Sequence, residues 1–273
     1  MNLEEIKKIL EEHKDSPILF KRNLLKEYLQ ILGLSFIYSQ KEYQSLIFYG
    51  GSCLRHCFDL PRLSEDLDFV DLNKKINLEK LAKDLSLFFG KFLVKPQIKI
   101  QKFRIYLKFP ILYHLKLARK PESEFVILKI EIFKGFDFCK GYLIEIVPVF
   151  KFGRSFLVRT LDLSSLMATK IRAILLRKWE KKDKKGRILA KVKGRDYFDL
   201  MWYLEKGVKP NLKCLGRRMS LEELKECLLK GVEKIDKKSL VYDLEGLIKQ
   251  KSFVKDLGRN LKKILIREIK ERL

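Results

Sequence analysis

The spacing of apolar and polar residues divides the chain into helical and extended segments. From about Leu3 to Gln40 the apolar residues recur at helical intervals, and Pro17 stands near the start of a second helix. The same spacing predicts an amphipathic helix from Leu78 to Phe92. Between these segments, the run from Ile47 to Arg55 is typical of a short apolar strand, a two-glycine turn and the start of another helix.

After residue 92 the period changes to that of half-buried strands. β-branched and aromatic residues alternate with polar ones from Phe92 to Phe109 and from Phe125 to Phe133, and the apolar run from Tyr142 to Phe150 predicts a further strand. Helical spacing returns from about Asp162, and three more helices are expected after Gly207. Strands mixed with helices on one side favour an α+β fold.

Candidate chemistry gathers at the glycine turn and at the strand that follows it. Gly50, Gly51 and Ser52 stand where a helix begins, so free backbone N–H groups and the helix dipole would face one anion. In the run Asp66-Leu67-Asp68-Phe69, strand alternation places Asp66 and Asp68 on one face. Two adjacent carboxylates attract a cation, and Mg²⁺ usually binds one or two carboxylates plus substrate phosphates. Together the two features indicate nucleoside triphosphate chemistry.

The charge of the chain changes the picture of its partners. The formal net charge is +24, from 59 Lys and Arg residues against 35 Asp and Glu. Such a surplus attracts polyanions, and binding of this kind weakens as salt rises. Nucleic acid is therefore the expected macromolecular partner, and the alternative is a basic soluble protein without a specific polyanion.

Half of the surplus lies between Lys151 and Arg195, which hold fifteen Lys or Arg residues and three acidic ones. The stretch from Lys181 to Arg187 is too polar to pack and predicts a mobile loop, which is either a solvated loop or an arm over an RNA backbone. In the second interpretation Trp179 stacks on a base. The predicted RNA-binding residues are Arg172, Arg177, Lys181, Lys182, Lys184, Lys185 and Arg187.

The five cysteines and the N-terminus bear on the cellular compartment. The number is odd and there is no Cys-x-x-Cys pair, so neither a disulfide scaffold nor a zinc module is expected. Cys53, His56 and Cys57 share helical spacing, and we expect them to pack rather than to bind a metal. The N-terminus does not have the pattern of a signal peptide, and no stretch has the length of a membrane span, so a cytoplasmic protein without membrane contact is expected.

The glycine turn and the acidic strand also resemble a known family. Gly50-Gly51-Ser52, followed by Arg62-x-Ser64-x-Asp66-x-Asp68, is similar to the signature of the DNA polymerase β superfamily of nucleotidyltransferases, in the form carried by AbiEii/AbiGii and MenT-type toxins. Lys170-x-x-Ala173-x-x-x-Arg177 and Arg195-Asp196-x-x-Asp199-Leu200 resemble the closing motifs of those toxins. The likeness spans roughly residues 46 to 204. Arg195 and Asp199 stand at i and i+4, so a structural ion pair is the alternative for these two residues.

The resemblance implies a fold and a set of site residues. The implied fold is an α+β nucleotidyltransferase core with a mixed, mostly antiparallel sheet and N-terminal helices over residues 1–158, joined to a helical C-terminal lobe over residues 159–273. A third acidic residue completes the metal site in that superfamily, and Glu131 matches it, although Asp is more usual there; Asp137 and Glu145 are the alternatives. The implied catalytic residues are Asp66, Asp68, Glu131, Lys170 and Asp196, of which Asp66, Asp68 and Glu131 hold the metal. The implied nucleotide-binding residues are Gly50, Gly51, Ser52, Ser64 and Lys170.

The resemblance also implies an activity. Its members transfer a nucleoside monophosphate from an NTP to a hydroxyl with Mg²⁺ or Mn²⁺, and characterised relatives modify the 3′ acceptor end of tRNA as the toxin of a toxin–antitoxin pair. RNA, in particular tRNA, and a neighbouring antitoxin are thus the expected partners. Three alternatives remain open: nucleotidylation of a protein or small-molecule hydroxyl, phosphotransfer, and an RNA-binding module without catalysis.

Overall fold

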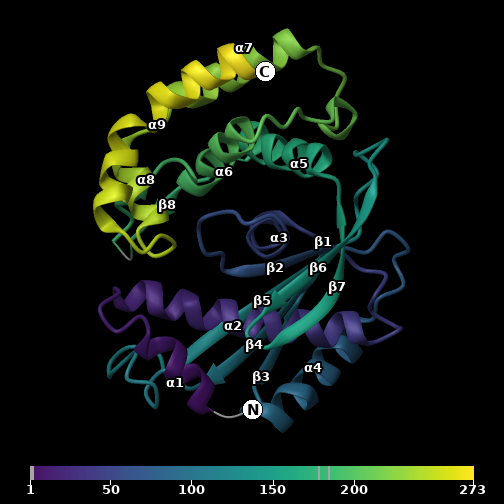
Figure 1. The fold of residues 1–273 in the computed structure, drawn as a ribbon, viewed down its shortest axis with the longest axis vertical. Helices are drawn as coiled ribbons and strands as arrows, with labels where there is room; N and C mark the ends of the chain where they lie inside the picture. Colours follow the sequence, from purple (N-terminus) through teal and green to yellow (C-terminus); the bar gives the residue numbers. More distant parts are fainter. Residues whose placement is uncertain (1–2, 178, 184) are drawn as a thin grey trace. The chain divides into compact units, whose positions relative to one another are not determined.

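The computed structural model describes residues 3–177, 179–183 and 185–273, which form two compact units (Figure 1). Unit 1 comprises Met1–Phe136 and Glu145–Thr160, and unit 2 comprises Asp137–Ile144 and Leu161–Leu273. The division into two domains, residues 1–158 and 159–273, stays a prediction. The compact units differ from them chiefly by the segment Asp137–Ile144, which belongs with the helices of unit 2.

Unit 1 is built on a seven-stranded sheet with the order β3-β4-β5-β2-β1-β7-β6. Its strands are β1 (Ile47–Tyr49), β2 (Asp66–Val70), β3 (Gln97–Gln101), β4 (Arg104–Pro110), β5 (Phe125–Phe133), β6 (Ile144–Lys151) and β7 (Arg154–Leu161). Strand β2 pairs in parallel with β5 and antiparallel with β1, while β4 pairs antiparallel with both β3 and β5. The sheet is therefore mixed, and the predicted α+β class is confirmed.

Four helices accompany this sheet within the described part of unit 1: α1 (Leu3–Glu11), α2 (Ile18–Ser39), α3 (Gly50–Cys57) and α4 (Leu78–Phe92). Pro17 directly precedes α2, where its fixed φ suits a helix start. Figure 1 shows α2 beside β5 and α4 beside β3 and β4. A Cβ atom on Gly33 of α2 would lie 3.6 Å from the side chains of both Leu67 and Leu128, so α2 packs directly on β2 and β5.

Strand β7 is an element that the spacing does not predict. It follows β6 through a turn in which Phe152 and Gly153 both have positive φ, 49° and 66°. In the sequence this segment belongs to the basic region, because Arg154 and Arg159 interrupt its apolar residues. The available signal is Gly153, a turn residue placed directly after an apolar strand.

Unit 2 is mainly helical. Its elements are α5 (Leu163–Leu176), β8 (Lys181–Lys182), β9 (Ile188–Ala190), α6 (Gly194–Glu205), the 3₁₀ turn η1 (Leu212–Cys214), α7 (Leu221–Glu233), α8 (Lys237–Leu244) and α9 (Lys251–Arg272). Helix α6 is buried along most of its length and contacts α5, α8 and α9. Side-chain caps begin α5, α7 and α8: Asp162 before α5, a capping box of Ser220 and Glu223 at α7, and Asp236 before α8. The described helices include none that is long and apolar enough to cross a membrane.

The basic stretch predicted as a mobile loop forms a short antiparallel hairpin of β8 and β9 in the described residues. The reason is the turn that Asp183 builds: its Oδ1 accepts hydrogen bonds from the backbone N–H groups of Lys185 (2.8 Å) and Arg187 (2.9 Å). Of the predicted RNA-binding residues, Lys184 lies outside the described residues.

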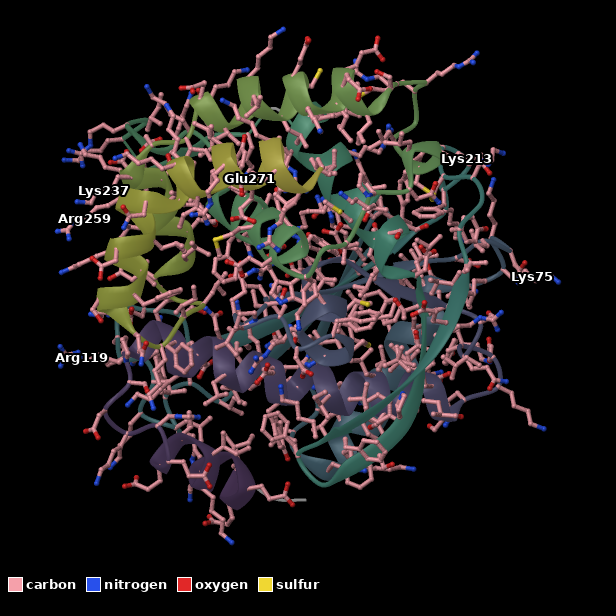
Figure 2. All side chains as sticks on the ribbon, turned by 45° about the horizontal axis from the view of Figure 1, so that its top comes forward. Lys75, Arg119, Lys213, Lys237, Arg259 and Glu271 are labelled. Carbon is pink, nitrogen blue, oxygen red and sulfur yellow. A yellow bond between two sulfur atoms is a disulfide. The ribbon has the colours of Figure 1, made fainter. Side chains whose placement is uncertain are left out.

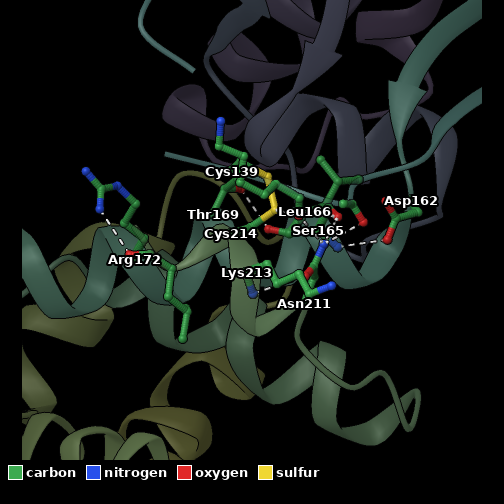
Figure 3. Close-up of a disulfide and its surroundings, with 12 residues drawn as sticks. Cys139, Asp162, Ser165, Leu166, Thr169, Arg172, Asn211, Lys213 and Cys214 are labelled. Atoms are coloured by element: carbon green, nitrogen blue, oxygen red, sulfur yellow. Dashed lines mark hydrogen bonds between the residues drawn. A yellow bond between two sulfur atoms is a disulfide. The ribbon is translucent and has the colours of Figure 1, made fainter. Parts of the chain in front are cut away.

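A disulfide joins Cys139 to Cys214, which corrects the expectation drawn from the cysteine count (Figure 3). The segment Asp137–Ile144 lies against η1, because Asn211 Nδ2 donates to the carbonyl oxygens of Lys140 (3.2 Å) and Gly141 (3.1 Å). That contact brings together two cysteines that are 75 residues apart in sequence. An odd count argues against a scaffold of several bridges but leaves room for one.

Candidate active site

The glycine turn and the acidic strand meet at the end of β1. Tyr49 is the register partner of Asp68, and Gly50 has φ of +79°, a conformation that suits glycine. A Cβ atom on Gly50 would lie 2.5 Å from Asp68 Oδ2, and one on Gly51 would lie 2.7 Å from Arg62 Nη2. Both glycines are thus required by side chains that approach the backbone at the start of α3.

Ser52 and Ser64 lie beside this turn. The Ser52 hydroxyl is fully buried and donates to the carbonyl oxygen of Asp66 at 2.5 Å, so it joins α3 to the start of β2. Ser64 is also buried, and its Oγ would lie 3.0 Å from a Cβ atom on Gly51. The structure gives the Ser52 hydroxyl a partner within the chain, and the predicted phosphate contacts of both serines stay predictions.

The pairing of β2 with β5 brings the three predicted carboxylates to one place. Its register sets Asp66 beside Lys129 and Asp68 beside Glu131. Lys129 Nζ lies 2.8 Å from Asp66 Oδ2 and 2.8 Å from Glu131 Oε1. Arg104 of β4 adds a second cation, with Nε 2.9 Å from Glu131 Oε1. The site is thus an ionic cluster in which Lys129 bridges carboxylates of two strands.

These contacts decide the charge of the cluster. Burial opposes the charge of Lys129, but the carboxylates of Asp66 and Glu131 outweigh it and raise the pKa of the ammonium. Burial likewise acts to raise the pKa of Glu131, yet hydrogen bonding from Lys129 and the charge of Arg104 bring that pKa below its ordinary value. Both groups are therefore charged at neutral pH.

The donor set favours two metal-binding carboxylates rather than three. Within the residues that the structure describes, no group of three His, Cys, Asp or Glu side chains is arranged to hold a metal ion. Glu131 is bound by two cations and Asp66 by one, so Glu131 is the less available of the two, and its metal contact stays a prediction. Asp66 and Asp68 form a pair of oxygen donors that fits Mg²⁺, which takes its other ligands from water and substrate phosphates.

In unit 2, Lys170 and Asp196 are brought together as partners. Lys170 Nζ lies 2.9 Å from Asp196 Oδ1 and 2.7 Å from Asp199 Oδ2, and both carboxylates are buried. Arg177 Nη1 donates to Asp196 Oδ2 at 2.6 Å. Burial opposes the charge of Asp196, but Lys170 and Arg177 hold its pKa well below the ordinary range. Arg195 forms an ion pair with Asp243, with Nε 3.5 Å from Oδ2.

The remaining predicted RNA-binding residues differ in their surroundings. Arg172 donates to the carbonyl oxygen of Leu215 at 3.0 Å and stacks over the ring of Phe138 at 4.2 Å, so it contributes to packing within unit 2. The hairpin side chains are exposed, although Arg187 Nε is held 2.7 Å from Asp183 Oδ2. The exposed residues are Lys181, Lys182, Lys185 and Arg187.

Sequence reasoning does not select Lys129 and Arg104 as site residues, and it gives Arg62 only as part of the signature, without a role. The only signal for Lys129 is its position two residues before Glu131, on the same strand face. Its contact with Asp66 depends on the register of β2 against β5, which no local pattern fixes. Arg104 carries no signal, because it reaches Glu131 only through the pairing of β4 with β5.

Cys53 and His56 pack inside unit 1, as expected. Cys53 Sγ lies 3.0 Å from Thr160 Oγ1, and His56 Nε2 lies 3.0 Å from Gln30 Oε1. Gln30 Nε2 in turn donates to the carbonyl oxygen of Ser64 at 3.0 Å. Burial lowers the pKa of His56 to about 3, so the ring is neutral at physiological pH.

Comparison with known proteins identifies this combination of fold and motifs. The family model described as nucleotidyl transferase AbiEii toxin of type IV toxin–antitoxin systems matches residues 36–268. The chain belongs to the AbiEii family. The match includes the glycine turn, the Asp66-x-Asp68 strand and both closing motifs, so the resemblance drawn from these residues is confirmed. Membership makes the chain a transferase of the nucleotidyltransferase type and implies an antitoxin partner.

Solved structures agree with this AbiEii assignment at the level of fold. MenT4, a nucleotidyltransferase toxin from Mycobacterium tuberculosis H37Rv, aligns with a TM-score of 0.55 and 12% identity over 97% of this chain and 89% of its own. JHP933 from Helicobacter pylori aligns with a TM-score of 0.52 and 18% identity over 91% of this chain and 92% of its own. No match was found among curated proteins.

Proposed function

We propose that this AbiEii-family protein transfers a nucleoside monophosphate from an NTP to an RNA hydroxyl, with the 3′ acceptor end of tRNA as the acceptor. The observation that carries the proposal is the register of β2 and β5, which gathers Asp66, Asp68 and Glu131 beside Gly50. The net charge of +24 favours RNA over an uncharged acceptor. Membership in the AbiEii family supports the proposal, since it makes the chain a nucleotidyltransferase toxin with an implied antitoxin partner.

Each residue of the cluster has a role in the proposed reaction. Asp66 and Asp68 would hold Mg²⁺ or Mn²⁺, which supplies positive charge to the triphosphate. The acceptor hydroxyl attacks the α-phosphorus, pyrophosphate leaves, and Glu131 takes the hydroxyl proton. Lys129 and Arg104 keep Glu131 ionised at neutral pH, and the same two cations weaken its affinity for the proton. Glu131 thus acts as a base in this proposal, and its predicted metal contact is secondary.

The second unit would supply charge for the leaving group. Lys170 neutralises the pyrophosphate in the proposed reaction, and Asp196 orients Lys170 through their ion pair. The backbone of Gly50 and Gly51 provides N–H groups to the phosphates, with Ser52 and Ser64 next to them. Since RNA and NTPs are both cytoplasmic, we place the activity in the cytoplasm.

Labelled nucleotides test the proposal. Purified protein is incubated with total RNA, Mg²⁺ and each NTP labelled at the α-phosphate, and the expected result is label in RNA of tRNA size. Asp66→Asn and Asp68→Asn should each reduce the transfer at least a hundredfold while the melting temperature stays unchanged. Asp15→Asn is the matched control, because Asp15 is exposed in the segment between α1 and α2. Full transfer by either Asn variant would contradict the proposed site.

A parallel incubation separates the alternatives. Label moved from the γ-phosphate but not from the α-phosphate would show a phosphotransferase. Label from the α-phosphate on protein, or on a small molecule, would show a different acceptor. RNA binding without any transfer of label in the presence of Mg²⁺ or Mn²⁺ would show that the protein is an RNA-binding module without catalysis.

A further inference from the structure

A large cavity lies within unit 2, apart from the residues assigned above to nucleotide and metal binding in unit 1. Its volume is about 950 Å³, the upper part of the range for ligand pockets. Helices α5, α6 and α7 and the chain around the hairpin line it. Every lining residue belongs to unit 2, so the cavity is a property of that unit alone.

The lining is strongly basic. Two acidic residues also line the cavity, and one of them, Asp196, is already engaged by Lys170 and Arg177. The basic lining residues are Arg177, Lys191, Lys193, Arg217, Lys230 and Lys234. Burial, together with the charge of Arg195, lowers the pKa of Lys193 to about 8. An anion beside Lys193 would offset that cost, so the cavity is suited to a phosphate.

The other walls suit a planar, partly apolar group. Trp179 is half-buried in the lining, and Ala173 and Ile174 of α5 add apolar side chains to it. A base stacks on such an aromatic side chain whatever its identity. Phosphate-binding cations beside an aromatic face are the combination found where proteins bind single-stranded nucleic acid.

We propose that this cavity binds one nucleotide of a single-stranded RNA segment, with its base on Trp179 and its phosphate beside Lys193. The inference rests on the proposed function, since it gives the acceptor RNA a holding site on the helical unit. An unpaired nucleotide fits the cavity, whereas a base pair within a duplex keeps its faces stacked on its neighbours. The neighbouring hairpin extends the basic surface for the flanking phosphates.

Intrinsic fluorescence gives a direct test. The chain has two tryptophans, Trp179 and Trp202, and Trp202 is buried. In a Trp202→Phe protein, a single-stranded RNA hexamer should quench the remaining emission, and a blunt RNA duplex should quench it at least tenfold less well at equal concentration. Adenosine monophosphate is the second probe, because it carries one base and one phosphate but has no neighbouring nucleotides. Equal affinity for this nucleotide and the hexamer would overturn the RNA assignment.

Two kinds of variant locate the binding. Lys193→Gln combined with Lys230→Gln should raise the Kd for the hexamer at least tenfold. The matched control combines Lys237→Gln with Arg259→Gln, two exposed cations of unit 2 outside the lining whose side chains project from the surface in Figure 2. Equal Kd values for the two double variants would overturn the proposal.

The second kind of variant fills the cavity without changing its charge. A Cβ atom on Gly231 would lie 3.5 Å from Tyr197 Oη and 3.8 Å from Ile174, so Gly231→Met places its side chain against the cavity wall. Hexamer binding should fall at least tenfold with retained helical circular dichroism, and unchanged binding would count against the cavity.

Failure of this inference and failure of the proposed function are distinguishable. An Asp66→Asn protein should bind the hexamer as tightly as the parent, although it transfers nothing. Binding at Trp179 without any transfer by the parent protein would refute the transferase alone. Transfer with normal RNA affinity in Gly231→Met would refute the cavity alone.

Discussion

Lys129 shows how a single side chain sets the state of the candidate site. Its ammonium stands between carboxylates of neighbouring strands, 2.8 Å from each. The chain's own cation therefore relieves the repulsion between Asp66 and Glu131. A metal bound by Asp66 would compete with Lys129 for the same oxygen, which links metal binding to the position of this lysine.

Ser52 offers a prediction at this scale. Ser52→Ala should lower the free energy of unfolding by about 1 to 3 kcal/mol, because the buried carbonyl of Asp66 loses its hydrogen-bond donor. Urea denaturation measures the change. Ser155→Ala, at an exposed position of β7, is the control and should stay within about 0.5 kcal/mol of the parent. Unaltered stability with weakened nucleotide binding would instead assign the hydroxyl to phosphate.

The residues of the site are predictable to the extent that their contacts are local. Asp66 and Asp68 share a face because strands alternate, and Gly50 is needed where the turn meets Asp68. Lys129 and Arg104 are not predictable, since they reach Asp66 and Glu131 only through strand pairing. Pairing register depends on the packing of the whole sheet.

At the scale of elements, α3 is fixed by a buried polar network that depends on pH. Burial lowers the pKa of His56 to about 3, whereas an unfolded histidine titrates near about 6.5. Between these values the unfolded chain binds a proton that the folded chain does not, so stability falls as pH drops from about 6.5 toward 3. Burial acts to raise the pKa of Glu27, but the charges of Lys151 and Arg55 lower it. Protonation of Glu27 therefore causes a further loss of stability at more acidic pH.

The expected loss between pH 7 and pH 5 is about 2 kcal/mol in the free energy of unfolding. Urea denaturation at both pH values measures it. His56→Gln keeps a neutral hydrogen-bonding side chain beside Gln30 and should flatten the dependence. Parallel pH profiles for the parent and this variant would show that His56 does not cause the loss.

The β8–β9 hairpin carries the prediction on RNA. Replacing the five cations between residues 181 and 187 with Gln should reduce the slope of log affinity against log salt by about 0.7 for each single-strand phosphate that these side chains contact in the parent. If the hairpin neutralises three phosphates, the slope should change by about 2, with nucleotide affinity at unit 1 unaffected. The five are Lys181, Lys182, Lys184, Lys185 and Arg187.

A matched variant removes the same charge from helix α9. Five of its exposed cations are replaced with Gln, namely Lys251, Lys255, Arg259, Lys263 and Lys270. A slope that falls equally in both variants would indicate a general effect of net charge. The basic stretch would then be a solvated segment without specific RNA contacts.

Elements with a strong period are predicted to the residue, as α4 and β5 show. The failures share a physical cause. The exposed positions of strand β7 mix Ser155, Leu157 and Arg159, so its alternation is weak, and the hairpin is held by Asp183 hydrogen bonds rather than by apolar packing. Periodicity detects burial, so it misses elements that other forces maintain.

For the whole molecule, the surface charge and the disulfide are the dominant features. Figure 2 shows basic side chains such as Lys75, Arg119 and Lys213 projecting from the surface. The bond between Cys139 and Cys214 joins two residues of unit 2 and closes a loop of the chain that includes Glu145–Thr160 of unit 1 (Figure 3). Charge repulsion favours expansion of the chain, and a cross-link limits it in the unfolded state.

Replacing Cys139 and Cys214 by Ser should lower the free energy of unfolding of oxidised protein by about 4 kcal/mol, the loop-closure value for a separation of 75 residues. Guanidinium denaturation with and without dithiothreitol measures it, and the double variant should not respond to the reductant. If dithiothreitol lowered the stability of the parent and of the double variant equally, the disulfide between Cys139 and Cys214 would be contradicted. Thiol alkylation in intact cells tests the proposed cytoplasmic location, where disulfides are rare.

The strand order of the sheet also has a consequence for synthesis on the ribosome. Strand β1 lies between β2 and β7, and Thr160 of β7 donates its hydroxyl to the carbonyl oxygen of Phe48 at 2.8 Å. More than a hundred residues separate these partners, so β1 emerges long before the strand that covers its second edge. The nascent chain therefore exposes an open sheet edge next to the glycine turn until β7 is translated, and only then can the turn and the acidic strand be held as in the finished protein.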